Sequence, residues 1–245
     1  MSKYFSLAFL LFAACPPCSV LAADGNEDPS AALKRAVVAN YADILHAQYE
    51  DAWKASLQMR TNILLFLHNP SVAGLTAARE SWVAGRQPYS QSEIARFYDG
   101  PIEPVEEYIN AWPLDLNYID YTIGMPDAGI INQTNLFPKL AREVLVGANE
   151  KEGEKTVSTG FHAIEFLLWG QDVYADSPGR RPYTDYVDAP TGPGLNAARR
   201  REYLRLVTQL LSDQLLHVAD QWAANDPTNY RAKFLSAPPD ASLEK

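Results

Sequence analysis

The chain has 245 residues, of which 47% are hydrophobic and 11% aromatic, and its formal net charge is −9. This length and composition suit one large folded domain or two small ones and exclude a disordered tail. The acidic balance disfavours nucleic-acid binding, which needs a basic surface, so we expect no nucleic-acid partner.

Residues 1–22 have the features of a secretory signal peptide. Lys3 precedes an apolar run from Tyr4 to Ala14, and Val20-Leu21-Ala22 forms a small-residue cleavage site. No later stretch approaches the roughly 18 to 20 apolar residues that a transmembrane helix needs. We therefore expect an exported protein of the periplasm or the cell surface, with no transmembrane span.

Both cysteines, Cys15 and Cys18, lie inside this leader. Cleavage after Ala22 would remove them and would exclude disulfides and cysteine-ligated metals from the mature protein. An alternative is that Ala13-Ala14-Cys15 is a lipoprotein cleavage site, which would leave a lipid anchor on Cys15. The later site fits cleavage better.

Two helices are predicted after the leader. Apolar residues between Ser30 and about His68 recur every three or four positions, which is typical of one long amphipathic helix. Asn69-Pro70 should end it, because the residue before a proline disfavours helix. Ser71 then provides the N-cap of a shorter helix that reaches about Gly85.

The segment from Gln87 to Asp127 is rich in prolines and aromatic residues. The prolines should break it into short helices and turns, while the aromatic side chains should pack it over the rest of the protein. Some of its carboxylates could reach a site, although we expect most to be solvated. They are Glu93, Asp99, Glu103, Glu106, Glu107, Asp115 and Asp120.

The next helices flank a long loop. We predict a helix over Asn135 to Ala148 and an almost entirely apolar one over Thr156 to Trp169, which Gly170 should end as a C-terminal cap. The region Asp172 to Asn196 is rich in proline and glycine and is predicted to be a loop. Loops of this length are usually functional or mobile.

Helical periodicity returns from Arg199 to Trp222, and a last short helix follows Asp226-Pro227. We interpret the basic cluster Arg199-Arg200-Arg201 as a solvated helix end with acidic neighbours. No long alternating pattern indicates a strand. The predicted fold is therefore all-α, a helical bundle with an irregular insertion rich in aromatic residues and proline.

The apolar helix over Thr156 to Trp169 carries a polar pair, His162 and Glu165. Their spacing of three residues places both on one face. The other side chains leave no obvious solvent face, so the sequence predicts a polar site inside a helical core. An alternative is a hydrogen-bonded His–Glu pair that only fixes helix packing.

A metal site is the main functional interpretation of this pair. Ferritin-like bundles use a related Glu-x-x-His arrangement, here in reverse order. Two protein ligands are too few, since zinc takes three or four and iron oxygenase sites three, so the others would come from the aromatic segment or from His217. The peptidase motifs do not fit, because Ala163 and Phe166 occupy the positions that H-E-x-x-H would need.

Two separated blocks of sequence resemble one known family. The block Gly160-Phe161-His162-Ala163-Ile164-Glu165, followed by Phe166-Leu167-Leu168-Trp169-Gly170, is similar to the G-x-H-x-x-E hallmark of the imelysin family. The second block resembles its iron-regulated branch and consists of Arg86-Gln87-Pro88-Tyr89, Glu93, Arg96-Phe97-Tyr98-Asp99-Gly100-Pro101-Ile102 and Ile109-Asn110-Ala111-Trp112-Pro113-Leu114-Asp115.

The resemblance, which runs from about Leu33 to the C-terminus, implies an exported helical protein connected with iron acquisition. The family is classified with metallopeptidases, although its members lack zincin motifs. The resemblance makes His162 and Glu165 the motif pair and implies that Gly160 lets the start of the helix pack closely. It also marks four auxiliary positions to which it assigns no roles: Glu93, Arg96, Asp99 and Asp115.

Members of the iron-regulated branch continue into a second helical bundle, with the motif facing the junction. By this resemblance, residues 23–245 form one imelysin-like domain that corresponds to the first half, with the second bundle absent or separate. An apolar face prepared for that bundle would then be exposed, which favours a partner bundle or self-association.

These observations lead to three functional hypotheses. The first is an exported accessory protein of iron acquisition that binds a divalent metal, iron or an iron-containing ligand near His162 and Glu165. The second is a metallopeptidase of the imelysin type, with Glu165 as general base for a metal-bound water. The third is a non-catalytic interaction module or a truncated remnant.

Overall fold

The computed structural model describes residues 28–245, and the predicted signal peptide, with Cys15 and Cys18, lies outside this range. The described part of the chain consists of helices and connecting segments without a β-strand, which confirms the predicted all-α fold. None of the helices between residues 28 and 245 is both long and apolar enough to cross a membrane.

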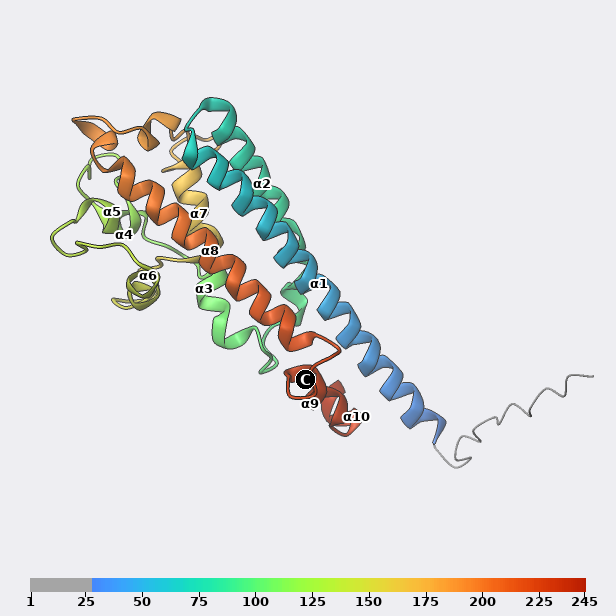
Figure 1. Cartoon of the computed structure of the whole chain (residues 1–245). Coiled ribbons are helices and arrows are strands. Elements are labelled where there is room, and N and C mark those ends of the chain that lie inside the picture. Colours follow the sequence, from blue (N-terminus) through green and yellow to red (C-terminus); the bar gives the residue numbers. More distant parts are fainter. Residues whose placement is uncertain (1–27) are drawn as a thin grey trace, which may run out of the picture.

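Three long helices form the frame of the molecule. Helix α1 (Pro29–His68) packs along α2 (Val72–Gln91) and α8 (Ala197–Trp222), and the shorter α7 (Gly160–Trp169) lies against α2 and α8 (Figure 1). As predicted, the side chain of Ser71 caps α2 by accepting a hydrogen bond from the Gly74 N–H at 3.1 Å.

The core follows the helical period of the sequence. The buried residues of α1 recur every three or four positions, because those positions lie on one face of the helix. They are Val38, Ala42, Leu45, Tyr49, Ala52, Ser56, Met59, Ile63 and Phe66. They pack with buried residues of α2, α7 and α8 in one continuous core.

Helix α2 is longer than predicted, since it passes Gly85 and includes Pro88 in its last turn. Tyr89 explains the extension. Its ring is 1% exposed and packs 5.4 Å from the ring of Phe161 on α7. Burial of a large aromatic side chain contributes about 1.5 to 3 kcal/mol, which offsets the hydrogen bond that Pro88 removes.

The segment after α2 forms short elements, as its prolines predict. They are η1 (Ser92–Ala95), η2 (Glu103–Val105), α3 (Glu106–Asn110), α4 (Leu116–Ile119) and α5 (Gly129–Asn132), where η denotes a 3₁₀ helix. Figure 1 shows α3, α4 and α5 in green beside α7 and α8. They cover the bundle, and α3 contacts α7 directly.

Two helices begin later than predicted. Helix α6 spans Arg142–Ala148 and not Asn135 to Ala148, because Pro138 lacks an N–H and the Phe137 carbonyl accepts from Arg199. Helix α7 begins at Gly160 and not at Thr156. The preceding backbone is extended at Thr159 and held by the Asn149 side chain, which accepts from the N–H of Ser158 and of Thr159.

The chain between α7 and α8 is a loop with two 3₁₀ turns, η3 (Tyr183–Tyr186) and η4 (Gly192–Asn196). Beyond α8, the short helices α9 (Tyr230–Ser236) and α10 (Pro239–Leu243) lie at the end of the bundle beside the first half of α1 (Figure 1).

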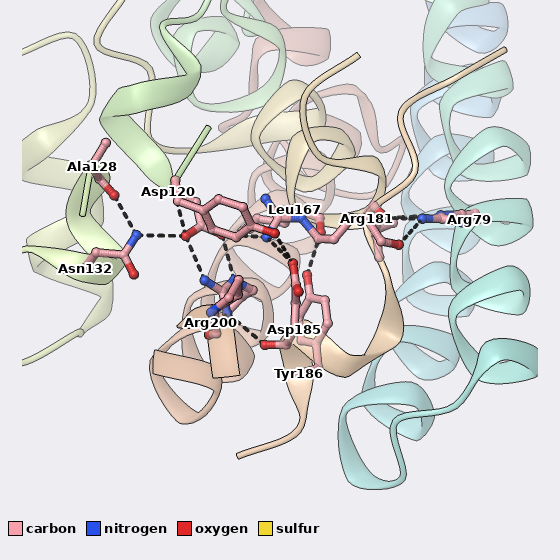
Figure 2. Close-up of polar contacts among 12 residues, drawn as sticks. Arg79, Asp120, Ala128, Asn132, Leu167, Arg181, Asp185, Tyr186 and Arg200 are labelled. Carbon is pink, nitrogen blue, oxygen red and sulfur yellow. Dashed lines mark hydrogen bonds and ion pairs between the residues drawn. The ribbon is translucent and has the colours of Figure 1, made fainter. Parts of the chain in front are cut away.

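A buried ionic cluster joins this loop to α8 and to the segment before α5 (Figure 2). Arg200 donates from Nε and Nη2 to the two carboxylate oxygens of Asp120, at 2.6 and 2.8 Å. Arg181 donates from Nη1 to Asp120 at 2.7 Å and to Asp185 at 3.2 Å. The Asn132 amide donates to Asp120 at 3.0 Å. We call Asp120, Arg181, Asp185 and Arg200 the buried ionic cluster.

The electrostatics of this cluster are dominated by burial and pairing. Burial by itself would raise the pKa of Asp120, but Arg181 and Arg200 together outweigh it and hold the pKa below its usual value. Burial would likewise lower the pKa of Arg181, and the neighbouring Asp120 reverses the shift. Both arginines therefore remain charged inside the protein.

The interpretation of Arg199-Arg200-Arg201 as a solvated helix end was wrong. Arg200 is 0% exposed. Arg199 donates to the carbonyls of Ile130, Ile131 and Phe137, and Arg201 donates to the carbonyl of Tyr186. The last carbonyls of the short helices α5 and η3, and the Phe137 carbonyl, have no partner within their own element, and arginine has enough donors to satisfy several of them at once.

Candidate functional site

The motif helix α7 is fixed at both ends by glycines. Gly160 has a φ of +85°, and a Cβ added there would lie 2.6 Å from the carbonyl oxygen of Ile109 on α3. Gly170 has a φ of +74° and donates its N–H to the Phe166 carbonyl at 2.7 Å. Glycine is the residue that adopts these conformations without strain. The absence of a side chain at Gly160 lets α3 pack against the first turn of α7.

His162 and Glu165 lie on the face of α7 that lines an open pocket of about 560 Å³. His162 Nδ1 is 3.1 Å from Glu165 Oε2, as expected for positions one turn apart. The side chains are 17% and 43% exposed, respectively. The expectation of a site enclosed within the core was therefore wrong: the pair borders the core and faces outward, because no helix of the described chain covers this face.

Aromatic and aliphatic side chains form most of the remaining wall. Trp82 of α2, Trp112 and Trp169 line the pocket, together with Leu114, Leu116 and Phe166. The Trp112 ring lies 4.8 Å from the His162 ring, and Trp82 contacts Trp169 edge-on at 5.4 Å. The Trp82 indole N–H donates to the Phe161 carbonyl at 3.0 Å, which fixes the orientation of that ring.

The loop after α7 completes the rim of the pocket. Asp172, Pro178 and Gly179 line it from this side. A Cβ on Gly179 would approach the Trp169 carbonyl oxygen to 2.6 Å, so the loop lies directly against the end of α7. The backbone N–H of Arg181 donates to the same carbonyl at 2.8 Å. This position is compatible with a functional role, one of the two roles, functional or mobile, that are usual for a loop of this length.

The described residues do not form a complete metal centre. Imidazole and carboxylate suit iron, zinc and copper, but no group of three or more His, Cys, Asp or Glu side chains with metal-binding geometry occurs within residues 28–245. His217, which the sequence offered as a further ligand, is exposed on α8 and does not line the pocket. The donor set fits a metal only if other ligands come from outside this part of the chain.

The four auxiliary positions separate into two groups. Glu93 and Arg96 meet: Arg96 Nη1 lies 3.6 Å from Glu93 Oε2 and 3.1 Å from Glu106 Oε1. Asp99 is exposed with a φ of +63°. Asp115 is an exposed N-cap of α4 that accepts from the Asn117 N–H at 3.0 Å. None of the four lines the pocket that contains His162 and Glu165.

Arg86 connects the Glu93 group with the motif helix. Its guanidinium lies 5.0 Å from the centre of the Phe161 ring and 5.2 Å from that of Tyr89. Burial lowers its pKa, and the charges of Glu93, Glu165 and Glu106 oppose this shift. Arg86 thus lies between two groups of carboxylates, a position that the sequence alone did not indicate.

Other residues of the pocket were also missed as site residues: Trp82, Trp112, Trp169 and Asp172. A signal for Trp169 existed, because positions 162, 165 and 169 follow the i, i+3, i+7 pattern of one helix face. No comparable signal connects Trp82 and Trp112 to α7, since their proximity arises from the packing of α2 and of the segment after α3.

Comparison with known proteins decides the family. The imelysin family model matches residues 45–245, which is most of the chain. The chain belongs to the imelysin family. Within this imelysin the G-x-H-x-x-E motif occupies the first two turns of α7, at the pocket described above.

Two solved structures share the fold of this imelysin. One, from Parabacteroides distasonis, is described as an iron-regulated protein A precursor; it has 22% sequence identity and a TM-score of 0.63, with 91% of this chain covered. The other, an imelysin-like protein from Psychrobacter arcticum, has 20% identity and a TM-score of 0.57, with 88% covered. This chain spans 57% of the length of each. No curated protein sequence matches it.

Proposed function

We propose that this imelysin is an exported accessory protein of iron acquisition that binds an iron-containing ligand or a metal ion at His162 and Glu165. The observation that carries the proposal is a solvent-accessible imidazole–carboxylate pair in the wall of an open aromatic pocket. The name of the Parabacteroides neighbour supports the link to iron. Export rests on the predicted signal peptide in residues 1–22.

An iron-containing ligand agrees better with this pocket than a bare ion. Two protein donors are fewer than a tight zinc or iron site requires. A metal that arrives already chelated needs few protein donors, and its organic shell could occupy the aromatic walls. The volume of about 560 Å³ lies within the usual range for sites of small organic ligands.

A second helical bundle would complete the site. Both structural neighbours extend well beyond the part that this chain matches. Two apolar residues that line the pocket are largely exposed, Val83 at 57% and Trp112 at 67%. We propose that a partner bundle covers this surface. Dimerisation of the mature chain with burial of Trp112 would show self-association instead, and a strict monomer at high concentration would exclude it.

Binding experiments test the proposed function. The mature protein would be titrated with Fe(III), Zn(II) and Cu(II) salts and with a ferric trihydroxamate, with tryptophan fluorescence and calorimetry as readouts. The gallium(III) chelate separates binding from quenching by iron. We expect the chelate to bind, and His162→Ala to weaken its binding at least tenfold while circular dichroism shows an unchanged helical content.

The matched control is His217→Ala, which removes an exposed histidine on α8 outside the pocket. It should bind as the wild type does. Equal binding by wild type and His162→Ala would contradict the proposal. Cleavage of an unfolded polypeptide that is sensitive to chelators and lost in Glu165→Ala would instead support the metallopeptidase alternative.

A further inference from the structure

The charge of the pocket wall carries an inference that rests on the proposed function and specifies its ligand. The ionisable residues that line the pocket are His162, Glu165 and Asp172, and no lysine or arginine of the described chain is among the lining residues. The exposed carboxylates of Glu165 and Asp172 therefore have no lysine or arginine beside them in the pocket wall.

Arg79 and Arg86, which lie close to the motif helix, do not line the pocket. Arg79 donates from Nε and Nη2 to the Leu168 carbonyl, at 3.1 and 2.8 Å, and from Nη2 to the Arg181 carbonyl at 2.8 Å. Arg86 lies over the rings of Phe161 and Tyr89, and its Nη1 is buried without a hydrogen-bond partner. Neither side chain is placed to donate to a ligand in the pocket.

The aromatic walls of the pocket also favour a cationic ligand. The face of an indole ring carries negative potential and attracts cations, more strongly than phenol or benzene rings do. Three tryptophans line this pocket. The Arg79 guanidinium already lies 5.6 Å from the centre of the Trp169 ring, whereas Trp112 is 67% exposed. The net charge of the whole chain, −9, also favours the approach of cations over anions.

We propose that the pocket is selective for ligands of positive charge. The ligand is an organic cation whose charged group lies among Trp112, Glu165 and Asp172. For the iron cargo this means a chelate with a protonated amine or another cationic group. Anionic chelates, such as tris-catecholates or polycarboxylates, are excluded because they would meet two carboxylates in a wall without lysine or arginine.

The test uses three chelates of different charge, two of which share the same core. Ferrioxamine B carries a free ammonium group, its N-acetylated form has the same hydroxamate core without that charge, and a ferric tris-catecholate is strongly anionic. Each chelate would be titrated into the mature protein with gallium(III) in place of iron(III). We expect the cationic complex to bind about tenfold more tightly than the acetylated one, as one cation–π or ion-pair contact implies, and the catecholate not to bind.

Variants locate the charge effect. Asp172→Asn keeps an oxygen that can accept from the Tyr174 N–H, now 3.0 Å from the Asp172 carboxylate, and removes only the charge. Asp172→Asn should reduce the preference for the cationic over the acetylated complex about threefold, and Trp112→Leu should reduce this preference further. Glu143→Gln removes an exposed carboxylate of α6 outside the pocket and should change nothing.

A metal-free cation, benzyltrimethylammonium, separates this inference from the proposed function. If it binds, with Asp172→Asn and Trp112→Leu weakening it, while none of the chelates binds, the charge selectivity holds and the iron cargo fails. Equal affinity for the ammonium and acetylated chelates would overturn the selectivity and leave the cargo proposal standing. If no probe binds, both are overturned.

Discussion

The buried ionic cluster and the motif pair on α7 use the same kinds of group in opposite ways. Asp120 is fully buried and accepts hydrogen bonds from both arginines of the cluster, the Asn132 amide and the Tyr121 N–H. Glu165 is 43% exposed and has one hydrogen-bond partner, His162. A buried carboxylate whose hydrogen bonds are all made stabilises the fold. An exposed carboxylate with one partner keeps acceptor positions that a ligand can use.

Among the substitutions suggested by this comparison, one at Asp120 should cause the largest loss of stability. Asp120→Ala leaves Arg181 and Arg200 as buried charges without their main partner, and such a loss destabilises by about 3–5 kcal/mol. Urea unfolding followed by circular dichroism measures it. As a control, Asp213→Ala removes the partially exposed pair with Arg142 and should cost less than about 1 kcal/mol. Similar losses in the two variants would contradict the distinction.

Acid should remove much of that difference. The pKa of Asp120 in the folded protein lies below its value in the unfolded chain, so the unfolded state binds the proton first. The stabilisation is complete above the unfolded pKa, near 4, and is lost as the pH falls through the lower, folded pKa. The free energies of unfolding of the wild type and Asp120→Ala should therefore converge below pH 4. A gap that stays constant down to pH 2.5 would show that ionisation of Asp120 is not its source.

The start of the motif helix is sensitive to substitution at Gly160, where α7 packs against α3. Gly160→Ala combines a positive φ with a clash against the Ile109 carbonyl, and we expect a loss of about 1–3 kcal/mol together with weaker ligand binding. Gly147→Ala is the matched control, since its Cβ meets no atom within 4 Å and it lies inside α6. That variant should be neutral or up to about 1 kcal/mol more stable. Unchanged stability of Gly160→Ala would disprove the close approach of α3 and α7.

The smallest effect on stability is expected at the motif pair. Glu165→Gln should change the free energy of unfolding by less than about 0.5 kcal/mol, because a partly exposed i, i+3 pair contributes little. Thermal and urea unfolding of the variant and the wild type measure this difference. A loss above about 2 kcal/mol would support the alternative in which the pair only fixes helix packing.

The sequence by itself determined the all-α fold, the long helices and the position of the motif. The apolar period between Ser30 and His68, the cap at Ser71 and the end at Gly170 are local patterns, and local hydrogen bonding and side-chain spacing are enough to specify them. The predicted helix boundaries next to prolines were less accurate. The local pattern predicted that α2 ends at about Gly85. Packing of Tyr89 against Phe161 on α7 extends it through Pro88.

Only the tertiary structure decided which charges are buried. From sequence, His162 and Glu165 lie in the most apolar helix and Arg200 in a basic cluster, yet the first two border an open pocket and Arg200 is enclosed. Burial depends on which segments pack over a side chain, and Asp120, 80 residues before Arg200, supplies the compensating charge. Composition and periodicity describe one helix at a time, so they contain no information on such partners.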